Sequence, residues 1–474
     1  MRKQRSLFHG RIPARTPRKD GDNPLVPDRR FAGVAPDAIE IRFNNATATQ
    51  FGGYPLLARY LDDLGLNAAL ASHIKMPRGP LAFTAPELSR FLIDAKLLGA
   101  DRLMHLERFR NDPVLTTTAG IDGLPSGKTM GVYLKQFEPN HLASLERLGT
   151  RLLDREWGRH CRERASDGII LDYDTTTLTT YGKQEGADRG RSFRKKDKPG
   201  FQPKFAFVGG LGLMLHHRLE PQSQGLQHGF LEFHEETLQR LPQGAWVRAV
   251  RGDGALYDFK IVREFERRGY TYAISAQRNA RLREAIAAIA ADAWEEWTDE
   301  RGRPASLARL RYCPKTWDQK PRTFVISRRL KRDARQGRLI EGEQYKYFAY
   351  VTNCKGPLFS QYQFCVERCS LESFVKEAKG AFDWQFLPCA ELSANRAYLL
   401  HVQLAYNLAI FFKLVAAPNG VNRWTIETLR TRLLCICGNL RYHAGRWLLS
   451  LPTWWPYQTV FRTMLRRLTV ALQV

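Results

Sequence analysis

Carboxylates in two separate parts of the chain have the spacing of a metal-binding site. Asp172 and Asp174 stand two residues apart in the β-branched run 169–181 (IILDYDTTTLTTY), so a strand would present both on one face. Asp253 follows the strand-like run 246–252 (WVRAVRG) at its carboxyl end. Open α/β sheets gather functional groups at strand ends, and oxygen ligands suit hard cations, above all Mg²⁺. These residues predict metal-assisted chemistry on a phosphodiester.

A third carboxylate, Glu372, lies in the segment 365–379 (CVERCSLESFVKEAK). Read as a helix, the segment places Glu372 roughly 40° from Arg368 and roughly 20° from Lys379 around the axis. One helical face then carries a cation, a carboxylate and a second cation. On an isolated helix this pattern is typical of a solvated face with ion pairs, but the carboxylates on the two strands favour a functional role.

Two other short patterns point to different enzyme classes. The sequence D-Y-D at 172–174 also matches the D-x-D of metal-dependent glycosyltransferases, which stays open as an alternative class. The sequence G-K-T at 127–129 looks like the end of a phosphate-binding P-loop. However, the position of that motif's first glycine is occupied by Asp122, and no apolar strand precedes it. A P-loop NTPase is therefore excluded.

The balance of charge points to a polyanionic partner. The 474 residues contain 73 Lys and Arg against 48 Asp and Glu, a net charge of +25. Such an excess causes self-repulsion in a compact chain unless a polyanion offsets it, so nucleic acid is the favoured partner. The alternative is a basic soluble protein without such a partner. With 43% hydrophobic residues, the chain is expected to form two or more domains.

Thiolate metal sites, disulfides and membrane insertion are not expected. The eight cysteines are scattered without paired spacing, which fits reduced thiols in the cytosol. No apolar segment follows the basic N-terminus, so no signal peptide is expected. The most apolar stretch, 397–417, is interrupted by residues that are costly in a bilayer: His401, Gln403, Asn407 and Lys413. This pattern predicts a buried helix in a globular core.

An α/β core must position the carboxylates. Between 166 and 277, β-branched and aromatic runs alternate with amphipathic segments, which predicts a mixed sheet flanked by helices. The predicted regions are a basic flexible arm (1–37), a helical DNA-binding region (38–165), the first part of the core (166–277), a β-rich insertion (278–355), the second part of the core with the Glu372 helix (356–415) and a helical C-terminal region (416–474).

Local signals predict individual helices within these regions. Thr84 and Glu87 form a capping box ahead of a helix that ends at Gly99. A helix is expected over 280–297, before the three strand-like runs of the insertion. The basic segment 430–449 is expected to be helical as well.

The motifs in this order resemble the DDE transposases of bacterial insertion sequences. The chain carries D-x-T in a first strand, GDG-x-x-Y at 252–257 after a later strand, and R-x3-E-x6-K on a helix. In the cut-and-paste class of that family, the third motif reads Y-x2-R-x3-E-x6-K. Further segments also look like the family: FGGYPLLARYLDDLGL from 51, YGKQEGA from 181 and ANRAYLLHVQLAYNL from 394. The resemblance extends over about residues 40–470.

The resemblance implies a ribonuclease H-like core with Asp174, Asp253 and Glu372 as catalytic, metal-binding residues. Asp174 is preferred to Asp172 because the family's first Asp is closely followed by Thr, here Thr176. Two Mg²⁺ ions are implied, which Mn²⁺ could replace. Side chains expected to contact DNA are Arg368, Lys376 and Lys379, with Trp317 as a candidate to receive a flipped base. Trp297 and Trp294 are alternatives for that last role.

The implied activity is cleavage of double-stranded DNA at the element's terminal inverted repeats, then strand transfer into target DNA through a hairpin. A homodimer on DNA in the bacterial cytoplasm, associated with the nucleoid, is implied too. One position departs from the family: its Tyr falls on Cys365, although Tyr362 lies one turn away. The alternatives are a catalytically impaired, DNA-binding repressor of transposition and a nuclease without strand transfer.

Overall fold

The computed structural model describes residues 36–76, 82–190, 198–298, 304–330, 345–367 and 369–471, with only the backbone described at 37, 369–372, 470 and 471. The chain divides into two units, 1–46 and 47–474. In the first unit the described part contains a 3₁₀ turn, Pro36–Ala38, and an ion pair between Arg42 and Glu40. The predicted basic arm, 1–37, lies almost wholly outside the described residues.

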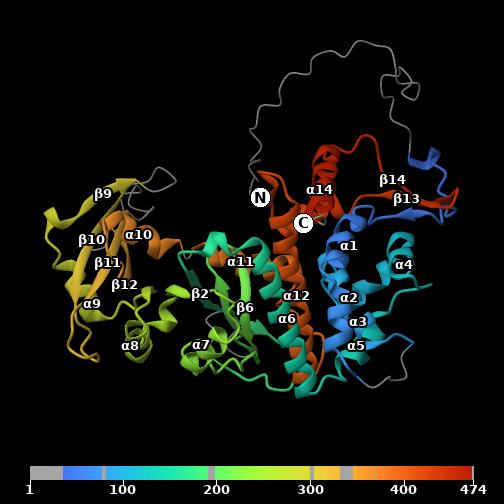
Figure 1. Ribbon diagram of the computed structural model, residues 1–474. Helices are drawn as coiled ribbons and strands as arrows, with labels where there is room; N and C mark the ends of the chain where they lie inside the picture. The colour runs from blue at the N-terminus through green and yellow to red at the C-terminus, as the bar shows by residue number, and fades with distance from the viewer. Residues whose placement is uncertain are drawn as a thin grey trace, which may run out of the picture. The chain divides into compact units, whose positions relative to one another are not determined.

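A large mixed sheet forms the centre of the second unit (Figure 1). Within the described residues its strand order is β6-β5-β2-β7-β8-β12-β11-β10-β9. Strands β2, β7 and β8 are parallel, whereas the other neighbours are antiparallel. The strands are β2 (Ile169–Thr175), β5 (Lys204–Val208), β6 (Leu213–Arg218), β7 (Val247–Gly252), β8 (Thr271–Ser275), β9 (Glu295–Thr298), β10 (Pro304–Tyr312), β11 (Arg322–Leu330) and β12 (Tyr345–Thr352). The mixed sheet flanked by helices that the sequence predicts is confirmed.

Helices cover the two faces of the core strands, and alternate side chains of β2 and β5 separate these faces. The Tyr173 ring lies 4.9 Å from Phe230 of α7 (Phe230–Leu238). On β5 the Phe207 ring lies 6.1 Å from Phe374 of α11 (Cys369–Phe382) and 6.1 Å from Tyr406 of α12 (Leu392–Ala416). Asp172 is in register with Phe207, so Asp172 and Asp174 face α11 and α12.

The region before the sheet is helical, as the sequence predicts. Its helices are α1 (Tyr54–Asp63), α2 (Leu66–His73), α3 (Ala85–Leu97), α4 (Pro113–Ala119), α5 (Gly127–Leu134) and α6 (Pro139–His160). The Thr84–Glu87 capping box is confirmed at the start of α3. Helix α12 is long and apolar enough to cross a membrane by length and composition, yet 78% of its most apolar window is buried within the protein. The expected buried helix is thus confirmed.

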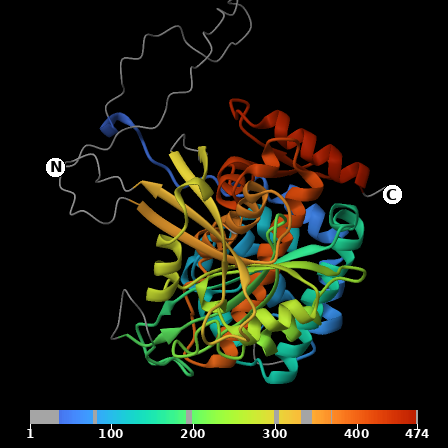
Figure 2. The same cartoon turned by 90° about the vertical axis from the view of Figure 1, so that its left-hand side faces the viewer.

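The β-rich insertion extends the core sheet. Strand β12 pairs with β8 through Val351 and Ile274, and the strands of the insertion follow outward from there. Figure 2 turns these yellow and orange strands toward the viewer. The helix expected over 280–297 is wrong in its second half, because α9 (Ala280–Ala287) ends there and 295–298 form the edge strand β9. Pairing of β9 with β10 overrides the local helical tendency.

The C-terminal region is only partly helical, which corrects the expectation for 416–474. A π-helical turn, Arg430–Leu434, leads into a hairpin of β13 (Gly438–His443) and β14 (Arg446–Ser450), followed by α14 (Gln458–Ala471). Strand β13 also pairs with β1 (Ala48–Thr49). The β1 partner and the tight turn at 444–445 make 438–450 a hairpin, although its apolar spacing fits a helix.

Candidate active site

The candidate active site lies where the parallel strands β2 and β7 end. Asp172 is in register with Arg251, so two further residues on each strand bring Asp174 and Asp253 to neighbouring positions. Asp174 is the penultimate residue of β2, and Asp253 directly follows β7. Both carboxylates are half-buried. Parallel pairing therefore joins two residues that are 79 positions apart in the sequence (253 − 174).

Asp172 has a different environment although it shares a face with Asp174. It is 0% exposed, and Arg251 donates to it from Nε to Oδ1 at 2.7 Å and from Nη2 to Oδ2 at 2.9 Å. Arg251 also donates to the carbonyl oxygen of Phe364 and to Glu367. Burial opposes the charge of Arg251, but the bonds to Asp172 raise its pKa. Asp172 and Arg251 thus form a buried, bidentate ion pair.

Backbone amides orient the two carboxylates at the strand ends. The Thr175 amide donates to Asp174 Oδ1 at 2.9 Å. The Ala255 amide donates at 2.9 Å to Asp253 Oδ1, which caps the 3₁₀ turn Gly254–Leu256. Such bonds stabilise the ionised form of a carboxylate, the form that binds cations.

Helix α11 carries the third predicted carboxylate. Glu372 lies in its first turn, but its side chain is outside what the structure describes, and Arg368 lies outside the described residues. Lys379 donates from Nζ to Thr176 Oγ1, just beyond the end of β2. Position 372 is seven residues before Lys379 and hence on the same face of the helix. The helix therefore runs across the end of the strand that holds Asp174.

A cavity of about 430 Å³ opens beside Asp174. Its wall includes two of the predicted DNA contacts, Lys376 and Lys379. The other lining residues are Thr175, Thr176, Val375, Gly380 and Gln385. The structure thus brings together Asp174, Lys376 and Lys379 around one opening.

Two buried cations that the sequence analysis missed hold the far end of α11. Lys96 Nζ donates to the carbonyl oxygens of Asp101 at 2.8 Å and Phe382 at 3.3 Å. Arg430 donates to carbonyl oxygens at the ends of α11 and α3: Ala381, Lys96 and Leu97. Burial lowers the pKa of Lys96 to about 7 and also lowers that of Arg430. Cations at a helix C-terminus are favourable, so this cluster positions α11 from the helical region.

The predicted aromatic contacts lie mostly inside the protein. Trp317 is 8% exposed, its ring lies 5.2 Å from Tyr257, and the Arg322 guanidinium lies 5.1 Å from the Trp317 centroid. Its edge lines a cavity of about 800 Å³ that also includes Lys260, Arg281 and Lys315. Trp297 packs on Tyr362, and Trp294 lies under the Arg328 guanidinium.

Cys365 and Tyr362 are both buried in α10 (Leu358–Val366). Burial raises the pKa of the Cys365 thiol above its usual range. Tyr362 accepts a hydrogen bond from Arg329 at 2.8 Å and packs with Leu307 and Val325. The structure therefore does not support Tyr362 as a substitute for the family tyrosine on a DNA backbone.

Asp174 and Asp253 supply the hard oxygen donors that a divalent metal requires. Among the side chains that the structure describes, no group of three or more His, Cys, Asp or Glu gathers as a metal site. Glu372 falls outside that set. The described donors thus fit two of the three predicted metal ligands.

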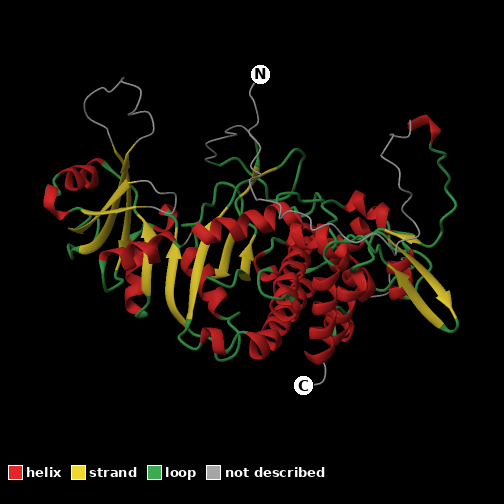
Figure 3. Ribbon diagram, turned by 90° about the horizontal axis from the view of Figure 1, so that it is seen from above, coloured by secondary structure: helices red, strands yellow, loops and turns green. Residues whose placement is uncertain are grey.

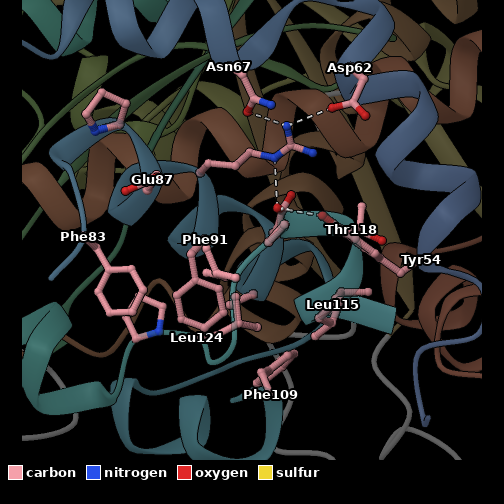
Figure 4. A pocket seen from close by; sticks show the side chains of 18 residues that line it. Tyr54, Asp62, Asn67, Phe83, Glu87, Phe91, Phe109, Leu115, Thr118 and Leu124 are labelled. Carbon is pink, nitrogen blue, oxygen red and sulfur yellow. Dashed lines mark hydrogen bonds and ion pairs between the residues drawn. The ribbon is translucent and has the colours of Figure 1, made fainter. Parts of the chain in front are cut away.

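A third cavity, of about 450 Å³, lies in the helical region away from these carboxylates (Figure 4). Arg90 reaches across it to Asp62 at 3.2 Å and Asn67 at 2.7 Å, and bonds Asp94 at 2.9 Å. The Tyr54 hydroxyl donates to Asp94 at 2.8 Å. This network ties α1, α2 and α3 together.

Comparison with known proteins gives a match to one family. The family described as Transposase DDE domain group 1 matches residues 31–473. A search of curated proteins finds no match. Among solved structures the chain is similar to the piggyBac transposase synaptic complex with hairpin DNA, at 9% identity and a TM-score of 0.40 over 80% of this chain and 78% of that chain. It is also similar to the Mos1 strand transfer complex, at 10% identity and a TM-score of 0.16 over 42% and 59%.

Proposed function

Because the chain belongs to the transposase family of DDE domain group 1, we propose that it cuts DNA at the ends of a bacterial insertion element and joins those ends to target DNA. Asp174, Asp253 and Glu372 are the proposed catalytic residues. The observation that carries the proposal is the pairing of β2 with β7, which brings Asp174 and Asp253 together at one end of the sheet. The strand order β6-β5-β2-β7-β8 supports a ribonuclease H-like core.

The same three residues are proposed to hold two Mg²⁺ ions, which Mn²⁺ could replace. Bound divalent cations would activate the attacking oxygen and stabilise the leaving oxygen of the phosphodiester. The contribution of this chain is geometric, since backbone amides fix Asp174 and Asp253 and the buried cations Lys96 and Arg430 fix α11.

Lys376 and Lys379 are proposed to bind phosphates of the strand being cut, because both line the cavity beside Asp174. Arg368 is proposed to act with them. Trp317 remains the candidate to stack on a flipped base, supported by its position in the wall of a cavity with basic residues.

The proposed reaction alternates two hydrolyses with two transesterifications, and only the transesterifications conserve the number of phosphodiester bonds. Water attacks the phosphorus at the element end and releases a 3′-OH. That hydroxyl attacks a phosphorus of the opposite strand, which forms a hairpin on the element end and releases the 3′ oxygen of the flanking DNA. Water then attacks the hairpin phosphodiester and frees the 3′-OH again. The freed 3′-OH then displaces a 3′ oxygen in the target strand. Cutting two ends together requires two active sites, so a homodimer on DNA is proposed, acting in the bacterial cytoplasm at the nucleoid.

A second candidate is a repressor that binds element ends without cutting them. Its support is Cys365 at the family's tyrosine position. A nuclease without strand transfer is the third, and it would yield nicks without joined products.

Cleavage of DNA carrying the element's own termini tests the proposal. Wild type should cut with Mg²⁺ or Mn²⁺, whereas Glu372→Gln should bind the same DNA without cutting it. If both bind and neither cuts, the repressor reading replaces the proposal. Equal cutting by both would mean that Glu372 is not a catalytic residue.

A further inference from the structure

The hairpin β13–β14 has a tight turn and an exposed tip. His443 pairs with Arg446, and the turn residues Ala444 and Gly445 have positive φ values of 47° and 76°. Two such residues form a type I′ turn, whose twist matches that of the strands and gives a well-defined hairpin. Figure 3 shows the two-stranded ribbon extending beyond the helices around it.

The base of the hairpin is fixed to the protein. The Leu440 amide donates to the Thr47 carbonyl at 2.9 Å, and Asn439 pairs with Ala48 of β1. Leu440 itself is buried. The exposed tip therefore extends from an anchored base, so its side chains keep a defined direction.

The two faces of the tip differ in chemistry. Tyr442 and Trp447 lie opposite each other on one face, are 63% and 55% exposed, and have ring centroids 5.1 Å apart. The alternation of a strand puts Arg441, His443 and Arg446 on the other face. All three are exposed, and among the described residues neither arginine has an ion-pair partner. An aromatic pair is thus backed by unneutralised cations.

The charge of the whole C-terminal segment favours a polyanion. No Asp or Glu follows Glu427 in the sequence, whereas six arginines besides the buried Arg430 do: Arg432, Arg441, Arg446, Arg462, Arg466 and Arg467. A protein surface of mixed charge would be expected to pair with acidic as well as basic residues in the region that binds it. The charged groups that DNA presents are all phosphates, and the major groove of DNA accommodates a two-stranded β-ribbon.

We propose that the hairpin tip, 441–448, is a contact for duplex DNA. Arg441 and Arg446 bind phosphates, and Tyr442 with Trp447 packs against sugars and base edges in the groove. This inference rests on the proposed function for its partner, but it assigns binding to a surface separate from the carboxylates. The hairpin therefore contributes affinity and register, and no chemistry.

Binding of a labelled duplex of mixed sequence, and of one with the element's terminus, tests the inference without divalent metal. Arg441→Ala/Arg446→Ala should weaken binding by about tenfold or more and lower the slope of log affinity against log salt by between about 1 and 2. Tyr442→Ala/Trp447→Ala should weaken binding with the slope unchanged. Because all four side chains are exposed, the unfolding temperature should stay near that of wild type.

Arg263→Ala/Arg283→Ala is the matched control. Both arginines are exposed, both lie on helices and not on the hairpin, and the same charge is lost. It should bind nearly as wild type does. If the control variant and the hairpin variant lose DNA affinity equally, the loss would be explained by net charge alone and the inference would be overturned. Unchanged DNA binding with a dimer converted to monomer in sedimentation would overturn it too, by making the hairpin a surface between copies.

The cleavage assay separates this inference from the proposed function. At a protein concentration above its raised Kd for DNA, Arg441→Ala/Arg446→Ala should still cut, because the carboxylates are unchanged. A wild type that binds through the hairpin but never cuts would leave the inference standing and remove the proposed function.

Discussion

Strand β2 holds one aspartate in its middle and one near its carboxyl end, and the two have opposite environments. Asp172 is sealed within the protein and bonded twice to Arg251. Asp174, two residues later on the same face, is half-buried beside an open cavity and is oriented by a backbone amide. A buried carboxylate is tolerated only with a matched cation, whereas one at a strand end can take a cation from outside. Asp172 is therefore suited to stabilising the fold, and Asp174 is suited to binding a cation.

The largest expected effect is on stability, at Asp172. Asp172→Asn leaves Arg251 buried without its bidentate partner and should lower the free energy of unfolding by about 3–5 kcal/mol. Asp172→Leu/Arg251→Met, which removes both charges, should recover much of that loss. Denaturant unfolding measures both variants. If the double variant is no more stable than Asp172→Asn, the pair's charges are not what the site requires.

Asp174→Asn should show the converse. Removing a side chain that only hydrogen-bonds to a metal ligand typically lowers metal affinity or activity by about 10–100-fold. Removing a ligand itself should therefore reduce end cleavage by more than about a hundredfold. The unfolding temperature should change little, because Asp174 is half-buried. Single-turnover cleavage and a melting curve on the same sample give both values. A stable Asp174→Asn that cuts normally would return Asp172 to consideration.

The pH dependence of stability extends the comparison to Lys96, a buried cation without a carboxylate bonded to it. Its pKa is lowered from 10.5 to about 7 by burial, so below pH 7 it is charged in both states and the full penalty of burial is present. Above pH 7 the folded protein releases this proton before the unfolded chain does. Stability relative to Lys96→Met should therefore rise with pH, at a slope approaching about 1.4 kcal/mol per unit. A pH-independent difference between the two proteins would contradict this account.

The smallest expected effect is at Cys365. Cys365→Ala should change cleavage by less than about twofold, since the thiol is buried and contacts no proposed substrate position. Cys365→Tyr should instead cost about 1–3 kcal/mol of stability through overpacking, without faster cutting. Strong stimulation of cleavage by the tyrosine would favour the reading of this chain as an impaired transposase.

Much of the architecture could be predicted because the core strands have local signals. The β-branched run at 169–175 and the capping box at Thr84 are visible in the sequence and present in the structure. The order of the three motifs also predicted a DDE transposase, and the comparison shows a DDE transposase family without specifying its insertion-sequence class. Fold class and the candidate carboxylates were thus within reach of sequence reasoning.

The remainder depends on contacts between distant parts of the chain. The role of Asp172 follows from its register with Arg251, and no spacing rule shows which strands are neighbours. A lone arginine in the otherwise apolar run AVRG was the one available signal of a buried partner. Lys96 and Arg430 act on carbonyl oxygens of other elements, and β9 and β13 become strands through pairing with distant segments.

The pairing of β1 with β13 has a consequence for when the fold can be completed. Ala48 and Asn439 are joined across 391 positions (439 − 48), and Arg430 closes on the ends of α3 and α11 only after most of the chain exists. Contacts of such long sequence separation form late in folding. A nascent or prematurely terminated chain that stops before 430 contains all three proposed carboxylates but lacks the parts that fix α11. The contacts of Arg430 with the ends of α3 and α11 can therefore form only when translation is nearly complete.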